Sequence, residues 1–136
     1  VRVYLRLAGG DANSTPTDAL LDKYVNAYTV NTNGPRTVVM FECHDKSGGY
    51  YRDDGSTPSL TDLRNFWKRV ALRYKNNPWV WFNIMNEPGY NTNATQEWYD
   101  LHNTVIQDIR AQGANNLIVC DGHNFASEEV NTRAGN

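Results

Sequence analysis

Short apolar runs alternate with stretches of helical spacing along the whole chain. The apolar runs are rich in β-branched and aromatic residues, as buried strands are, and they occupy 1–7, 37–44, 79–85 and 117–121. Between them, apolar residues recur every three or four positions, as on a helix that buries one face. This spacing runs through 20–28, 60–74 and 98–109. The pattern predicts the element order β-α-β-α-β-α-β.

The ends of these helices carry their own signals. Thr17 is a candidate N-cap for the first helix, and Pro78 stops the second. Gly113 stands where a C-cap would end the third. One more helix is expected to begin in Ser-Glu-Glu-Val at 127–130.

Strands that alternate with helices favour a parallel sheet with right-handed crossovers. Long polar loops such as 45–58 follow strands, whereas the helix-to-strand connections are short. In barrels with this asymmetry the strand-to-helix loops build the functional site. We therefore expect an α/β fold in which residues 1–136 form one domain, a portion of a (β/α)8 barrel.

Composition excludes several classes of function. The chain is 40% hydrophobic and 21% charged, an ordinary globular mixture, and its formal net charge is −2. No basic stripe is present, so nucleic acid is not an expected partner. No apolar run approaches the roughly 20 residues that span a bilayer, so no membrane partner is expected either. Cys43 and Cys120 lie within expected strands, where a small buried apolar role is favoured over a disulfide framework.

The chain opens on a strand pattern, without a starting Met, and we expect it to be a piece of a longer protein. Glycosylation sequons occur at Asn13 and Asn93 in loop-like stretches. Because such sequons also arise by chance, they favour a secreted, extracellular location only weakly.

Polar and titratable residues gather at one end of the expected strands. The second strand ends in Glu42, His44 and Asp45, the third in Asn86-Glu87, and the fourth in Asp121 followed by His123. Alternation along a strand directs Glu42 and His44 to one face, and the same holds for Asp121 and His123. A site of carboxylates, imidazoles and an amide suits acid/base chemistry.

These motifs resemble those of glycoside hydrolase family 5. Asn86-Glu87-Pro88 resembles the signature of the large clan of retaining glycosidases with eight-stranded barrels, and 80–88 looks like the acid/base strand of this family. The run 39–45 resembles the family strand that ends in a substrate-site histidine, 117–122 the strand after Asn-Glu-Pro, and 1–3 an early strand that carries an arginine.

The resemblance implies roles for individual residues. Glu87 would be the general acid that protonates the glycosidic oxygen and then the base that activates water. Asn86 would hydrogen-bond the sugar 2-hydroxyl, an interaction that strengthens in the transition state. His44 and Arg2 would hold the hydrogen-bond network of the site and the charge of the nucleophile.

Three more residues are candidates for substrate binding. Asp45 belongs to a His-Asp-x-x-Gly loop at 44–48 that is similar to one in β-mannanases, so mannan is the first expected substrate and cellulose the second. Tyr50 could stack on a sugar ring, although packing within its loop is favoured. His123 could contact substrate, although a role in capping a loop at the strand end is favoured.

The resemblance is incomplete at one point. A retaining mechanism needs a second Glu about 5 Å from the first, and in the family it comes three strands after Asn-Glu-Pro. Glu128 and Glu129 follow only one more strand. A full barrel takes about 250 residues, so this chain would cover about strands 2 to 5. We expect it to hydrolyse no glycoside alone; the remainder of the barrel would come from the parent chain or another chain.

Two alternatives stay open. The first is a non-catalytic barrel domain that binds glycan or has a structural role in a larger assembly. The second is the association of two such halves, because four parallel strands leave both edges of the sheet unpaired. The histidines at 44, 102 and 123 share no metal-ligand spacing, and zinc-type cysteine pairs are absent, so no metal and no cofactor are expected.

Overall fold

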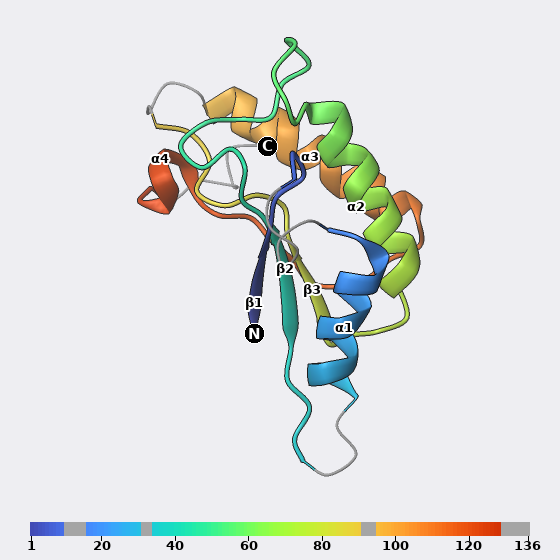
Figure 1. Ribbon diagram of the computed structural model, residues 1–136. Coiled ribbons are helices and arrows are strands. Elements are labelled where there is room, and N and C mark those ends of the chain that lie inside the picture. The colour runs from blue at the N-terminus through green and yellow to red at the C-terminus, as the bar shows by residue number, and fades with distance from the viewer. Residues whose placement is uncertain (10–15, 31–33, 91–94, 129–136) are drawn as a thin grey trace, which may run out of the picture.

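The computed structural model of the chain describes residues 1–9, 16–30, 34–90 and 95–128. Its centre is one sheet of four parallel strands in the order β1-β2-β3-β4 (Figure 1). The strands are β1 (Arg2–Leu5), β2 (Val39–Cys43), β3 (Val80–Asn83) and β4 (Ile118–Val119). The predicted order of strands and the parallel sheet are confirmed. The sequons at Asn13 and Asn93 lie outside the described residues.

Three long helices connect the strands: α1 (Asp18–Thr29), α2 (Leu60–Tyr74) and α3 (Thr95–Ala111). In Figure 1, α1 and α2 lie along the same side of the sheet, and α3 runs beside α2. The Thr17 side chain accepts a hydrogen bond from the Leu20 backbone N–H at 3.2 Å, so the predicted N-cap is confirmed. Gly113 has a φ of 77° just after α3, which is the left-handed cap that glycine favours.

Alternation along the strands separates two faces of the sheet. Val39, Phe41 and Val80 are fully buried on the face that carries the helices. On the other face of β1, Arg2 and Tyr4 are exposed, and no helix covers this side of β1 in Figure 1. The helical face of the sheet is therefore covered, whereas the opposite face is exposed at β1.

The regular strands are shorter than the apolar runs that predicted them. The first run extends to Leu7, whereas β1 ends at Leu5. The Leu7 N–H donates instead to the Asp45 carboxylate, 2.7 Å away, so it no longer points to a neighbouring strand. The chain thus leaves the sheet where the Leu7 N–H bonds to the Asp45 side chain instead of to a strand.

A fourth, short helical element, α4 (His123–Ala126), follows β4. Residues 124–126 have φ values of 53° to 59°, so this turn is left-handed. For the two described residues of the expected helix at 127–130, the prediction is wrong. The N–H groups of Ser127 and Glu128 donate back to Asn124 and His123 and close the turn.

Neither cysteine of the sheet region is paired. Cys43 is buried and Cys120 is half-buried. Burial raises the pKa of the Cys43 thiol well above its usual value and that of Cys120 to about 11, so both stay protonated near neutral pH. Within the part of the chain that the structure describes, no helix has the length and hydropathy to cross a membrane.

Candidate active site

The carboxyl ends of the four strands meet at the upper end of the sheet in Figure 1. Three loops cross this end, after β2, β3 and β4. They bond to one another through their backbones: Asn86 N–H donates to the Cys43 carbonyl at 2.8 Å, and Gly89 N–H to the Gly49 carbonyl at 2.9 Å. The backbone segments that follow β2 and β3 are therefore hydrogen-bonded to each other.

Glu87 lies at this end, four residues after β3 and half-buried. Its φ of 44° is left-handed, an uncommon conformation for a residue other than glycine. The Gly48 N–H donates to its carbonyl at 2.7 Å. Glu87 and His44 thus belong to the same rim of the sheet, and the Glu87 carboxylate accepts no hydrogen bond from the described residues.

A network of charged groups links β1, β2 and β3 beneath this rim. Glu42 is 1% exposed; it forms an ion pair with Arg2, and His44 Nδ1–H donates to its Oε1 at 2.5 Å. The predicted alignment of Glu42 and His44 on one face is confirmed. Arg2 also donates to Asn86 Oδ1 at 2.5 Å, and the Asn86 amide donates to Ser47 Oγ at 2.6 Å.

Asp121, two residues after β4, joins the network. Its sequence position placed it among the strand-end carboxylates, but no individual role was predicted for it. Its Oδ1 accepts from Asn83 Nδ2 at 2.9 Å, while its Oδ2 accepts from the Glu87 backbone N–H at 3.2 Å and from Arg2 at 3.4 Å. Its position at the end of a strand was the available signal. The signal is weak because polar residues at strand ends often only cap loops.

Tyr50 and His123 form a separate pair beside this network. The Tyr50 hydroxyl lies 2.8 Å from His123 Nδ1, and the two rings stack with centroids 6.2 Å apart. Both are buried, at 5% and 2% exposed. Gly89 is in contact with both: a Cβ there would lie 2.5 Å from His123 Nδ1. This geometry favours packing for Tyr50, and the substrate roles of both residues stay predictions.

Asp45 faces the loop after β1. Its carboxylate accepts from the backbone N–H groups of Leu7 at 2.7 Å and Ala8 at 3.2 Å, and from the Tyr51 hydroxyl at 3.4 Å. Asp45 therefore anchors the β1 loop, and its predicted contact with substrate stays a prediction. The predicted residues that the structure brings together in one hydrogen-bonded network are Arg2, His44, Asn86 and the backbone of Glu87.

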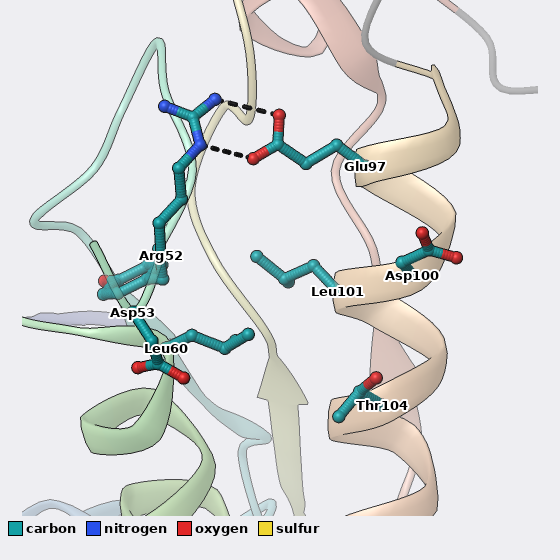
Figure 2. A pocket seen from close by; sticks show the side chains of 8 residues that line it. Arg52, Asp53, Leu60, Glu97, Asp100, Leu101 and Thr104 are labelled. Carbon is teal, nitrogen blue, oxygen red and sulfur yellow. Dashed lines mark hydrogen bonds and ion pairs between the residues drawn. The ribbon is translucent and has the colours of Figure 1, made fainter.

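A separate cavity of about 420 Å³ lies between the 51–60 segment and α3, as Figure 2 shows. Arg52 and Glu97 span it with two hydrogen bonds of 2.5 Å and 2.8 Å. The other lining residues are Tyr51, Asp53, Leu60, Asp100, Leu101 and Thr104. None of the residues around Glu87 lines it, so this cavity lies outside the candidate site. The described residues contain no group of three metal-binding side chains.

His102 supports the site from α3. It is 1% exposed, stacks on Trp98 at 4.1 Å, and donates from Nδ1 to the Trp98 carbonyl. Trp98 in turn donates to the Asp121 carbonyl at 2.9 Å. Burial lowers the pKa of His102 from 6.5 to about 4.

This pKa predicts a loss of stability in mild acid. The unfolded chain takes up a proton near pH 6.5 and the folded chain only near pH 4, so stability is lost as pH falls between these values. The loss should reach roughly 3 kcal/mol near pH 4. Urea unfolding at pH 7 and 4.5 measures it. His102→Phe, which cannot titrate, should reduce the difference between the two pH values; an unchanged difference would contradict the assignment.

The comparisons with known proteins place the chain in a family. Residues 9–135 match the family model Cellulase (glycosyl hydrolase family 5). A manganese dependent endoglucanase of Phanerodontia chrysosporium is 28% identical over 120 residues, which is 85% of this chain and 30% of that protein.

Solved structures agree with this assignment. XacCel5A in complex with cellopentaose superposes with a TM-score of 0.69 at 25% identity over 92% of this chain and 40% of that one. The catalytic domain of a mannanase from Streptomyces sp. SirexAA-E gives 0.69 at 23% identity over 92% and 37%; at that identity the likeness concerns the fold alone. The chain thus spans less than half of the relatives it matches, as a portion of a (β/α)8 barrel. Its sequence match, its parallel sheet and its strand-end Asn-Glu-Pro all agree: the chain belongs to the cellulase family, glycosyl hydrolase family 5.

Proposed function

We propose that this chain supplies the acid/base part of the active site of a retaining endo-β-1,4-glycan hydrolase, with Glu87 as the acid and base. The observation that carries the proposal is which of the strand-end carboxylates accept hydrogen bonds. Glu42, Asp45 and Asp121 all accept hydrogen bonds from groups of the chain itself. The half-buried Glu87 carboxylate accepts none from the described residues, so it is the one of the four that is left to meet a substrate.

The chemistry requires two steps. In the first, the Glu87 carboxyl gives its proton to the glycosidic oxygen as the C–O bond breaks, and a second carboxylate bonds to the anomeric carbon. In the second, the Glu87 carboxylate takes a proton from water, and the water oxygen displaces the enzyme carboxylate from the same carbon. One residue therefore acts as acid and then as base.

The surrounding groups suit this task. Asn86 accepts from Arg2 and donates one amide hydrogen to Ser47, so its second amide hydrogen is left for a sugar hydroxyl. The Arg2 guanidinium, tied to Glu42, brings a positive charge to the same end of the sheet. A guanidinium there would stabilise the carboxylate that attacks the sugar.

The second carboxylate is proposed to come from strands beyond this chain. Among the described carboxylates near Glu87, Glu42 is too buried to reach a sugar, and Asp121 accepts from three donors of the chain itself. The chain spans 40% of XacCel5A, which leaves room for the missing strands. The term complete barrel denotes a protein in which this chain is continuous with the remaining strands of a family 5 barrel.

The proposed substrate is a β-1,4-linked glycan outside the cell, which also implies a secreted protein. The loop at 44–48 favours mannan, whereas the relative of Phanerodontia chrysosporium is an endoglucanase and XacCel5A was solved with cellopentaose. Both polymers therefore belong in the test.

The test compares the complete barrel with the 136-residue chain on soluble β-mannan and carboxymethylcellulose. The complete barrel is expected to release new reducing ends with a rapid fall in viscosity, the mark of internal cleavage, and the chain alone to release none. Turnover by the chain alone would show that it holds its own nucleophile. A complete barrel that binds the polymers without cleaving them would support the non-catalytic alternative.

A further inference from the structure

Both backbone polar groups of Glu87 are tied to neighbouring strands. Its carbonyl accepts from Gly48 N–H at 2.7 Å, in the loop after β2. Its N–H donates to Asp121 Oδ2 at 3.2 Å, at the end of β4. Between these two bonds the residue has a φ of 44°. A left-handed backbone is unfavourable for a residue with a Cβ, so it persists only where its surroundings hold it.

Asp121 is itself held in place. Asn83, which is buried on β3, donates to its Oδ1 at 2.9 Å. Arg2 reaches its Oδ2 at 3.4 Å and the Asn86 amide oxygen at 2.5 Å. The Asp121 carboxylate thus connects the Glu87 backbone with Asn83 on β3 and with Arg2 on β1. Arg2 in turn bonds to the Asn86 side chain.

We propose that Asp121 is the positioning residue of Glu87: by accepting its backbone N–H, Asp121 selects the left-handed conformation that directs the Glu87 side chain. This proposal rests on the proposed function. The direction of a side chain depends on the backbone φ at its own residue. The Asp121 carboxylate bonds to the backbone N–H of Glu87 and not to the Glu87 carboxylate. An acid displaced by about 1 Å can lose about 100-fold in rate.

The decisive variant is Asp121→Asn in the complete barrel. Asparagine keeps the shape but has one acceptor oxygen in place of two, so it cannot accept from Asn83 and from Glu87 N–H with separate oxygens. Asp108→Asn is the matched control, because Asp108 pairs with Arg64 on the helical side, outside the site.

A misplaced acid has a specific kinetic signature. A natural glycan leaves as an alkoxide unless it is protonated, whereas 2,4-dinitrophenolate leaves without a proton. For Asp121→Asn, kcat/KM should fall about 100-fold on the glycan and less than about threefold on a 2,4-dinitrophenyl β-glycoside. Equal losses on both substrates would show a role in folding or binding and would overturn the proposal.

A second measurement does not depend on activity. In the wild-type complete barrel, the Glu87 amide should exchange slowly with solvent, and in Asp121→Asn at least about 10-fold faster. The Asn86 amide, which donates to Cys43, should keep its protection in both. An unchanged Glu87 amide would overturn the proposal whatever the kinetics. A wild-type protein without any glycosidase activity would refute the proposed function, and the amide result would still decide the role of Asp121.

Discussion

Replacement of Glu87 by glutamine in the complete barrel is expected to lower kcat/KM on an unactivated β-1,4-glycan by at least about 1,000-fold. Glutamine has the size of glutamate but carries no proton to give to the glycosidic oxygen and cannot take one from water. The Glu87 backbone bonds to Gly48 and Asp121 do not involve the side chain, so the loop should keep its conformation.

Glu97→Gln is the matched control for this variant. Glu97 is also a glutamate near the loops, but it pairs with Arg52 at the separate cavity of Figure 2. Because exposed ion pairs contribute about 0–1 kcal/mol, this variant should keep its activity within about twofold. Initial rates on both polymers, with circular dichroism as a check of folding, measure the difference between the two variants. A loss below about 10-fold for Glu87→Gln would refute the acid/base role.

Azide separates the second step from the first. With a 2,4-dinitrophenyl glycoside the Glu87→Gln protein can still form the glycosyl-enzyme. This intermediate is then hydrolysed slowly, because the variant has no base to activate water. Azide needs no base: its nitrogen bonds to the anomeric carbon as the enzyme carboxylate leaves. Added azide should therefore accelerate turnover and yield a β-glycosyl azide from a β-glycoside. An α-product would exclude retention through a covalent intermediate.

The parts of this site that the sequence predicted are those set by local pattern. Period-two alternation predicted that Glu42 on β2 and His44 just after it point to the same side, and the two are hydrogen-bonded at 2.5 Å. Thr17 was predictable as the cap of α1 because a hydroxyl side chain three residues before Leu20, the first apolar position of the helical pattern, matches a local rule. The element order brought Asn86-Glu87 to the same rim as His44, since carboxyl ends of parallel strands meet.

The parts that could not be predicted depend on contacts between distant residues or on a single dihedral angle. Nothing local to Asp121 shows that its oxygen meets a backbone N–H 34 residues earlier, because the contact depends on the φ of Glu87. The Tyr50–His123 pair joins residues 73 positions apart. The helix expected at Ser127 was misplaced because a left-handed turn has no periodic signature.

The uncovered face of β1 explains why one charged side chain of the site is partly exposed. The Arg2 side chain is 48% exposed although it pairs with buried Glu42. In a closed barrel, interior side chains from opposite strands fill that space. Arg2 and Tyr4 therefore occupy positions that further strands of a family 5 barrel would cover. The ion pair should be better shielded from solvent in the complete barrel than in this chain.

Trp67→Ala is expected to destabilise the complete barrel by about 3–5 kcal/mol. The Trp67 ring on α2 is fully buried, and its centroid lies 5.4 Å from that of Phe82 on β3. Its Nε1–H donates to the Ile84 carbonyl at 3.0 Å, two residues before Asn86. The variant therefore loses buried apolar surface and also leaves a buried carbonyl without its donor.

Two further variants separate these effects. Trp67→Phe keeps most of the apolar area and loses only the N–H donor, so its cost should be about 1–3 kcal/mol. Leu72→Ala, at a residue 55% exposed on the same helix, should cost less than about 0.5 kcal/mol. Urea unfolding followed by circular dichroism gives all three values.

Because the indole is bonded to the backbone that leads into Asn86 and Glu87, the phenylalanine variant should lose protection of the Asn86 amide in hydrogen exchange before it unfolds. If Trp67→Ala cost no more than Leu72→Ala, α2 would not pack on β3 as described, and the rigid support assigned to the acid/base residue would have to come from elsewhere.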